Sequence, residues 1–327
     1  MITNLAIADE IDKNPLDKNL DQSCKNILSN IQILARILKA CVLEFKDISL
    51  EEIPAYIEYE TIRNEAGNDK IKGMNTEDHT ISGATIRYDV LFTVKIPGTD
   101  ESIGLIINVE AQNYKPSYPL LSRAVYYCAR LIARQKNQAE GFDHSDFQNL
   151  KKVYSIWIVM NSAKKKEGVF NQYTIKEECL RKTYHFPKED YDKLSIIMLY
   201  PNNEYDKNEE ADSFMNMLYI LFKAEMTPED KKYQLCENYG ILMTKELAKE
   251  VEDMCNLSQG IRDEARAEGL AKGRAEGMAR GRAKGLSEAV KSLMNSMNLS
   301  MDKAMDCLNI AKDIRPAVIK NIENEKK

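Results

Sequence analysis

The sequence has few of the side chains that most metal centres and hydrolytic triads use. It holds three histidines, His79, His144 and His185, which lie far apart in the chain. Its seven cysteines are also scattered, and none belongs to a Cys-x-x-Cys pair. This pattern favours reduced thiols and argues against a zinc site. The same shortage argues against a Ser-His-Asp triad, so any hydrolytic chemistry must use carboxylates.

Long apolar runs and an excess of positive charge are also lacking. No apolar stretch approaches the roughly 20 residues that span a bilayer, and the N-terminus lacks the pattern of a secretory signal. We therefore expect a cytoplasmic protein without a membrane partner. The 327 residues carry a net charge of −5, so no global positive field indicates a nucleic-acid partner. Binding to nucleic acid would have to come from local basic patches.

What the sequence does contain is a β-hairpin pattern from Arg87 to Gln112. Two β-rich runs flank the polar segment Pro97–Glu101, which has the composition of a strand connection. A turn centred between residues 99 and 100 makes one face of the hairpin apolar throughout, and a slip of one residue would destroy that face. The facing pairs on it are Val90 and Val109, Phe92 and Ile107, and Val94 and Leu105.

The opposite face of this hairpin carries the candidate chemistry. The same register puts Asp89 across from Glu110, and Arg87 across from Gln112. Two carboxylates that face each other across a ladder repel, and a metal ion between them reverses the sign of that cost. Their oxygens suit Mg²⁺, which can polarise a phosphodiester and activate a bound water. The hairpin is therefore the first place to look for a site.

Helical spacing of apolar residues predicts one helix from Asp21 to about residue 45, after a loose lead-in over residues 1–20. Asp21 suits the N-cap or first turn, and it shares a helix face with Lys25. This pair is either a capped surface ion pair or the source of a third acid near the hairpin.

A second helix is expected from Leu120 to Gln135. We predict a core stripe of apolar residues on it and a separate stripe of basic and aromatic residues. The second stripe is either solvated or in contact with phosphates, for which Arg supplies bidentate donors. The core stripe is Leu121, Val125, Cys128 and Ile132, and the other is Arg123, Tyr127, Arg130 and Arg134.

The remaining chain predicts an α/β domain over residues 21–258, with a mixed sheet flanked by helices. Buried strands are expected at residues 153–160 and 194–200, and helices at 212–223 and 228–249. Glycine recurs every four residues from Gly269 to Gly285, which predicts a marginal helical linker over residues 259–286. Its alternatives are self-association and weak contact with polyanions. Residues 287–327 predict a small tail of two short helices.

Four motifs in this order resemble those of the PD-(D/E)XK nuclease family transposases, which are related to bacterial recombination-promoting nucleases. A buried strand and a glycine-repeat tail follow the motifs, so the resemblance covers nearly the whole chain. It implies a restriction-endonuclease-like PD-(D/E)XK core that cleaves DNA with Mg²⁺, or with Mn²⁺. The motifs are Asp21-x-x-x-Lys25, Arg87-Tyr-Asp-Val90, Asn108-Val-Glu-Ala-Gln112 and Tyr118-Pro-x-x-x-Arg123-x-x-x-Tyr127.

By position, the resemblance makes Asp89 and Glu110 metal ligands and Asp21 the helix acid. It places Gln112 where lysine is usual, and glutamine can hydrogen-bond but carries no charge. Lys115 is one alternative source of that charge. Another alternative is a catalytically inactive DNA-binding or oligomeric assembly protein that keeps the fold. The residues expected to contact DNA are Lys25, Arg87, Arg123, Tyr127 and Arg130.

Overall fold

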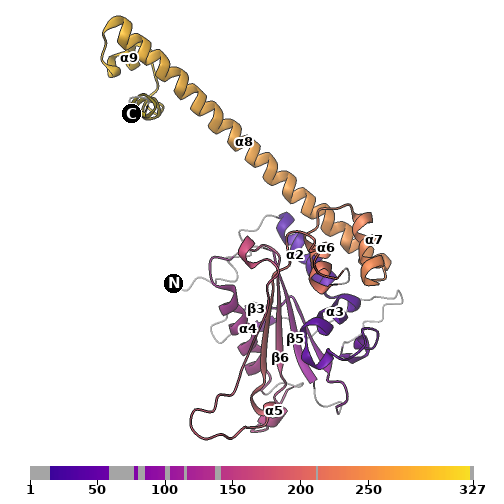
Figure 1. Cartoon of the computed structure of the whole chain (residues 1–327). Helices are drawn as coiled ribbons and strands as arrows, with labels where there is room; N and C mark the ends of the chain where they lie inside the picture. Colours follow the sequence, from indigo (N-terminus) through magenta and orange to yellow (C-terminus); the bar gives the residue numbers. More distant parts are fainter. Residues whose placement is uncertain are drawn as a thin grey trace. The chain divides into compact units, whose positions relative to one another are not determined.

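The computed structural model of the chain describes residues 15–58, 77–79, 85–99, 104–113, 116–136, 141–210 and 213–324. The chain divides into two compact units, Met1–Ser258 and Gln259–Lys327. A mixed six-stranded sheet with the order β1-β4-β5-β6-β8-β7 forms the centre of the first unit (Figure 1). Its strands are β1 (Ile57–Glu58), β4 (Val90–Lys95), β5 (Gly104–Gln112), β6 (Val153–Val159), β7 (Phe170–Thr174) and β8 (Leu194–Leu199).

The three central strands β5, β6 and β8 are parallel, whereas the pairs β1–β4, β4–β5 and β7–β8 are antiparallel. A separate antiparallel pair is formed by β2 (Glu77–His79) and β3 (Thr85–Arg87). All seven residues of β6 are buried, as expected for a strand covered on both faces. The strands predicted at residues 153–160 and 194–200 are therefore confirmed.

The predicted register of the β4–β5 hairpin is confirmed at every apolar pair. Val90 pairs with Val109, Phe92 with Ile107, and Val94 with Leu105. The ladder ends at Val90, however, so the predicted pairing of Arg87 with Gln112 is wrong. Arg87, in β3, instead pairs with Glu77 in β2. The side chain of Asp89 accounts for this ending, because its carboxylate accepts the Ala111 N–H at 2.9 Å.

Helices cover both faces of the sheet, and each face has its own apolar core. Figure 1 shows α4 (Leu120–Arg134) on one side of the strands and α3 (Ile31–Cys41) and α6 (Phe214–Phe222) on the other. The helices α2 (Pro15–Leu28) and α7 (Pro228–Tyr239) and the first turns of α8 (Lys245–Met297) contribute to the same core as α3 and α6. Short elements complete the unit, namely η1 (Leu43–Phe45), η2 (Ile53–Tyr56), η3 (Phe147–Asn149), η4 (Lys164–Lys166) and α5 (Lys188–Tyr191).

The single helix predicted from Asp21 is wrong, because the segment forms two helices. Pro15 begins α2, a position where the missing N–H of proline costs nothing. Asn30 has extended backbone angles, and its side chain caps α3 by accepting the Gln32 N–H at 3.0 Å. Asp21 therefore lies in the middle of α2 and does not cap a helix.

The helix predicted over residues 228–249 is also interrupted. Gly240 has a φ of 59°, and its N–H closes α7 on the carbonyl of Cys236. Glycine adopts this left-handed conformation without the steric cost that other residues meet. The next helix, α8, begins at Lys245.

In α4 the predicted bounds are nearly correct and the predicted core stripe is correct in part: Cys128 is buried, and Leu121 and Ile132 are partly buried against the same core. The buried residues are Ala124, Tyr127, Cys128 and Leu131, whereas Val125 is 46% exposed. The helix turns this face toward the sheet because Tyr127 packs its ring against Tyr88 and Trp157.

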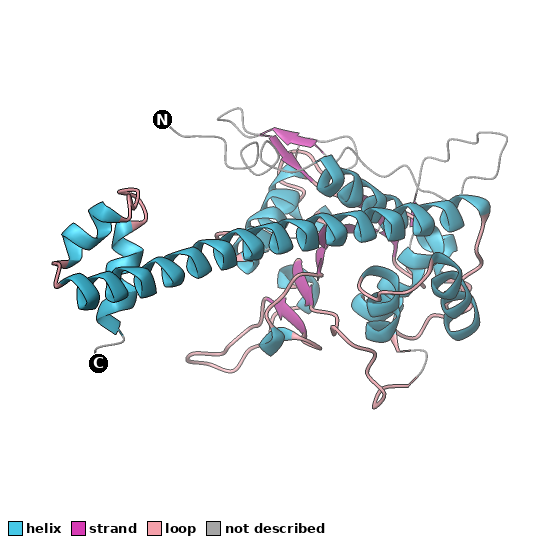
Figure 2. Cartoon of the chain, turned by 90° about the horizontal axis from the view of Figure 1, so that it is seen from above, coloured by secondary structure: helices cyan, strands magenta, loops and turns pink. Residues whose placement is uncertain are grey.

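The second unit consists of the later part of α8 with α9 (Met301–Cys307) and α10 (Arg315–Asn324). Figure 2 shows that α8 continues without a break through the glycine repeat. A small apolar core joins the three helices, and α10 is a helix that the sequence did not predict. The core residues are Val290, Ala304, Met305, Ile310, Val318 and Ile322. In the described part of the chain, no helix has the length and apolar character needed to cross a membrane.

Candidate active site

Asp89 and Glu110 are held together where β4 begins and β5 approaches its end. Asp89 Oδ2 accepts the Ala111 N–H at 2.9 Å, and Glu110 Oε1 accepts the Asp89 N–H at 3.4 Å. Glu110 thus accepts a hydrogen bond from the backbone of Asp89, just before β4, and Asp89 accepts one from the β5 residue next to Glu110. The side chain of Asp89 is 13% exposed, and Glu110 is 3% exposed. The two acids are therefore adjacent, as predicted, but they do not form the predicted ladder pair, because the ladder ends at Val90.

Glu110 has an electrostatically unfavourable position. Burial raises its pKa well above the usual value of 4.5, and the charge of Asp89 raises it further. The positive charges of Arg123 and Lys25 and a hydrogen bond to Asn108 act in the opposite direction but do not cancel the effect. The negative charge of these two adjacent carboxylates is only partly balanced by the nearby cations. A hard divalent cation, which prefers oxygen ligands, would balance the remainder.

Helix α2 brings a cation to these acids. Lys25 Nζ lies 3.0 Å from Asp89 Oδ1, and the lysine side chain is 34% exposed. Burial lowers the pKa of Lys25, but the charge of Asp89 and the hydrogen bond to it raise that pKa by more. Lys25 is therefore an ammonium ion at neutral pH.

The acid on the same helix has a different partner. Asp21 Oδ1 accepts a hydrogen bond of 2.7 Å from Nδ2 of Asn113, the residue that follows Gln112. Asp21 thus lies at the end of β5, beside the site. Cys24, one turn from Asp21 on α2, is fully buried, and burial raises its pKa to about 12, so that it stays a thiol.

Arg123 on α4 approaches the site from the other face of the sheet. Its guanidinium lies 4.9 Å from the ring centre of Tyr127 and 5.5 Å from that of Trp157. It also donates a hydrogen bond of 3.0 Å to the Tyr118 hydroxyl. The pKa of Arg123 is raised by the neighbouring Tyr127 and Glu110, which outweigh the lowering effect of burial.

The expected basic and aromatic stripe on α4 is therefore not an exposed one. Tyr127 is only 6% exposed, and burial raises its pKa to about 12. Arg123, Arg130 and Arg134 are each partly buried. Helical spacing correctly placed these residues on one face of α4. It did not predict that Arg123 packs over the rings of Tyr127 and Trp157, which makes this face partly buried.

Of the other predicted site residues, some lie within the described part of the structure and some do not. Gln112 is 5% exposed at the end of β5 and pairs with Val159 of β6. Arg87 ends β3, but its side chain and the whole of Lys115 lie outside the described residues. Sequence reasoning missed Asn113 and Trp157; an asparagine directly after the strand acids and a tryptophan in the next strand were the available signals.

A mixed sheet with flanking helices and two acids at the end of its hairpin defines an α/β fold of the PD-(D/E)XK nuclease type. A family model described as PD-(D/E)XK nuclease family transposase matches residues 65–267, and the chain belongs to this family. The family implies a nuclease-type function, and its nucleases generally use divalent metals. Searches of the curated proteins and of the solved structures found no significant match.

Proposed function

We propose that the protein is a metal-dependent endonuclease that hydrolyses DNA phosphodiester bonds, of the mobile-element or recombination-promoting type. The observation that supports this proposal most is the pair of carboxylates formed by the partly buried Asp89 and the buried Glu110, in which Asp89 accepts the Ala111 N–H and Glu110 accepts the Asp89 N–H. Their carboxylate oxygens would hold Mg²⁺ or Mn²⁺. When bound, such an ion polarises the phosphodiester and lowers the pKa of a bound water.

The protein's own residues have distinct tasks in this proposal. Asp89 and Glu110 would hold the ion as carboxylates. Arg123 favours the carboxylate form of Glu110, because its positive charge lowers the pKa of Glu110. Asp21 holds Asn113 and thereby positions the end of β5 next to Gln112.

Lys25 takes the place of the lysine that the strand lacks at Gln112. A cation near the scissile phosphate stabilises the charge that develops in the transition state, and glutamine cannot do so. Lys25 is the cation that α2 places 3.0 Å from Asp89, and part of its side chain remains open to substrate. Arg130 and Arg87 are proposed as contacts to DNA phosphates outside the reacting centre.

The test of the main proposal is nicking of supercoiled plasmid in Mg²⁺ or Mn²⁺. Asp89→Ala and Glu110→Ala should each abolish nicking. Asp192→Ala is a matched control, since Asp192 is also an ion-paired carboxylate, with 14% exposure and a lysine, Lys152, at 2.9 Å. The control should nick as the wild type does. Equal nicking by wild type and both site variants would refute the proposal.

The role of Lys25 needs its own comparison. Lys25→Met should reduce the nicking rate by about tenfold or more, the scale of one lost transition-state contact of about 1.4 kcal/mol. Lys25→Arg keeps the charge and should retain part of the rate, whereas Gln112→Ala should have the smaller effect. A greater loss in Gln112→Ala than in Lys25→Met contradicts this assignment.

Gln112 also supports a second candidate, a catalytically inactive protein that binds DNA or assembles into oligomers through the glycine repeat. Calorimetry separates the two candidates. Binding of DNA without any binding of Mg²⁺ or Mn²⁺ favours the inactive protein. Metal binding that disappears in Glu110→Ala favours the nuclease.

A further inference from the structure

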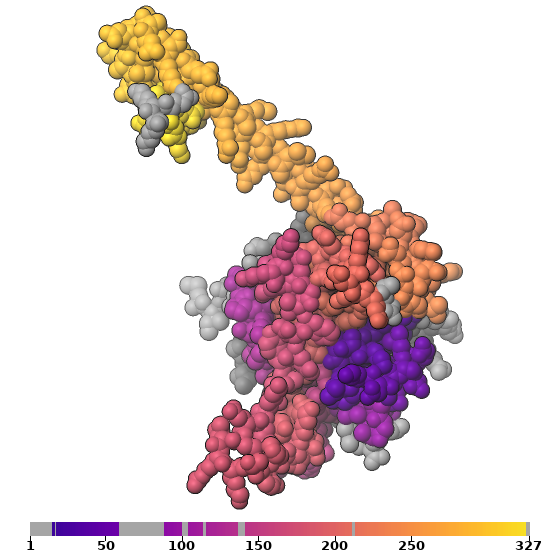
Figure 3. Space-filling view, in the orientation of Figure 1, coloured from indigo at the N-terminus to yellow at the C-terminus, as the bar shows by residue number. Residues whose placement is uncertain are grey.

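We propose that Glu177, Cys179 and His185 form a second metal site, for Zn²⁺ or a chemically similar ion, on the segment that joins β7 to α5. This segment lies at the lower end of the first unit in Figure 3, in magenta. The site is independent of the proposed nuclease centre. It also departs from the sequence argument against zinc, which considered only Cys-x-x-Cys pairs and the distance between histidines along the chain.

Three different ligand types converge in the cluster. One oxygen of Glu177, the sulfur of Cys179 and a ring nitrogen of His185 all lie within 4.8 Å of one another. Cys179 Sγ is 3.9 Å from His185 Nδ1, and that nitrogen is 2.7 Å from Glu177 Oε2. The chain has only three histidines and seven cysteines, so their meeting with a carboxylate at one point is an uncommon arrangement.

These separations are close to those of a tetrahedral zinc site. Zinc bonds of about 2.0–2.3 Å to nitrogen, oxygen and sulfur put neighbouring ligand atoms roughly 3.3–3.7 Å apart. The sulfur–nitrogen distance needs almost no change. The nitrogen–oxygen distance is that of a hydrogen bond, and the ion would replace the proton between Nδ1 and Oε2.

A catalytic triad is a poorer interpretation of the same three residues. In a triad the histidine uses its two ring nitrogens for two different partners, so that a proton can pass through the ring. Here the thiol and the carboxylate both approach Nδ1. Two potential ligands beside the same ring nitrogen suit a cation that all three residues share. They do not allow a proton to pass through the ring from one partner to the other.

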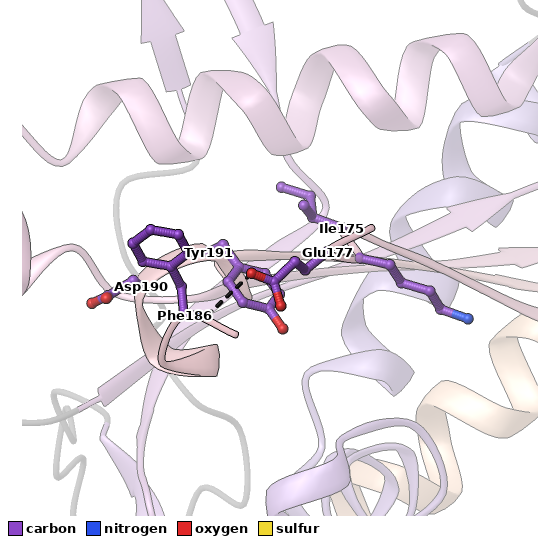
Figure 4. Close-up of a pocket in the computed structure, with 6 residues that line it drawn as sticks. Ile175, Glu177, Phe186, Asp190 and Tyr191 are labelled. Carbon is purple, nitrogen blue, oxygen red and sulfur yellow. Dashed lines mark hydrogen bonds between the residues drawn. The ribbon is translucent and has the colours of Figure 1, made fainter. Parts of the chain in front are cut away.

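The backbone around the cluster holds its ligands in place. Phe186 N–H donates to Glu177 Oε1 at 3.1 Å, the bond that Figure 4 marks with a dashed line. The Cys179 thiol lies 3.4 Å from the carbonyl oxygen of Tyr184. The rings of Tyr184 and Phe186, on either side of His185 in sequence, meet edge to face at 5.0 Å.

Glu177 presents both of its carboxylate oxygens to the loop, Oε1 to the Phe186 N–H and Oε2 to His185 Nδ1. The His185 side chain is 73% exposed, which leaves the fourth ligand position open to water. A pocket of about 320 Å³ adjoins Glu177, and its walls are Ile175, Lys176, Glu177, Phe186, Asp190 and Tyr191.

The segment also has a structural need that an ion would meet. None of residues 171–190, all of which the structure describes, is buried, and residues 175–187 form neither helix nor strand. Few apolar contacts therefore hold this long loop in place. A bound metal would close the nine-residue loop from Glu177 to His185 and supply its folding energy directly.

The test uses full-length protein freed of metal and titrated with Co²⁺, a spectroscopic probe for zinc sites. We expect one equivalent to give the thiolate-to-cobalt charge-transfer band, and Zn²⁺ to displace it. The band should disappear in Cys179→Ser and in His185→Ala. Cys236→Ser and His144→Ala remove an exposed cysteine and an exposed histidine elsewhere and should keep it. A band that persists in Cys179→Ser, or is absent from the wild type, overturns the proposal.

Two further measurements keep this site separate from the proposed nuclease centre. The Asp89→Ala, Glu110→Ala double variant should retain the cobalt band in full, whatever its nicking activity. Zn²⁺ should slow tryptic cleavage after Arg181 and Lys182 at least severalfold in the wild type and leave the rate in Cys179→Ser unchanged. Equal cleavage of wild type with and without Zn²⁺ counts against an ordered metal loop.

Discussion

Replacing Glu110 by glutamine should stabilise the first unit at neutral pH in the absence of divalent metal. The pKa of Glu110 is raised in the folded state by burial and by Asp89. Its contribution to stability is therefore present below the unfolded pKa near 4.5 and is lost as pH rises through the folded pKa. Glutamine keeps the shape of the neutral acid, so it avoids the cost of ionisation above that pH.

The expected gain is about 1–3 kcal/mol, the scale of the desolvation penalty of a buried polar group. The exposure of 3% places Glu110 among buried groups, for which solvent screening is weak. In a unit of this size, each kcal/mol shifts the melting temperature by about 2–4 °C. Glu110→Gln should therefore melt about 2–12 °C above the wild type in EDTA near pH 7.5.

Tryptophan fluorescence is a suitable assay, because Trp157 is the one tryptophan of the chain and is fully buried in the first unit. Glu44→Gln is the control of opposite sign, since Glu44 accepts from Tyr154 and pairs with Lys152 and should lose stability when neutralised. The gain in Glu110→Gln should shrink as pH falls toward 4.5. A variant that melts below the wild type, or a gain that does not depend on pH, refutes the electrostatic reasoning.

Three other perturbations have defined outcomes. Asn30→Ala removes the cap of α3 and should cost about 1 kcal/mol, measured by urea unfolding followed by tryptophan fluorescence; no change would mean that the cap is replaced by water. Gly273→Ala with Gly277→Ala should raise the melting temperature of the helical signal, because a methyl group at either position meets no atom within 4 Å and alanine favours helix by about 1 kcal/mol. A loss of helix or of oligomer mass in sedimentation would instead indicate that the glycines lie in a contact between chains. Arg123→Met removes a charge that lowers the pKa of Glu110, so Mg²⁺-dependent stabilisation should require a higher pH than in the wild type; an unchanged pH midpoint contradicts this.

The hairpin was predictable because the position of its polar turn and the alternation of its apolar residues indicate the same register. An apolar face fixed the register of β4 and β5, and the structure has that register at each predicted apolar pair. The end of the ladder was not predictable by counting residues. Asp89 ends it by accepting a backbone N–H with its side chain, and alternation along a strand contains no signal for such a bond.

Helix boundaries failed for a related physical reason. Apolar spacing continues across Asn30 and across Gly240, so periodicity alone joined segments that side-chain capping and a left-handed glycine separate. Both residues are known stop or start signals, but each also occurs inside helices. On α4 the period was correct but the buried face was displaced toward Tyr127, because Tyr127 contacts Tyr88, between β3 and β4, and Trp157 of β6.

The position of Lys25 bears on how activity is inferred from motifs in this family. The family match begins at residue 65, so it includes both carboxylates but not the helix that carries the nearby ammonium. A glutamine two residues after Glu110 would by itself suggest an inactive site. The packing of α2 against β5 places a cation at Asp89 from a distant part of the sequence, and in the proposed function this cation supplies the charge that glutamine lacks. In this fold the charge of the site is therefore a property of the helix–sheet contact, and the strand motif alone does not determine it.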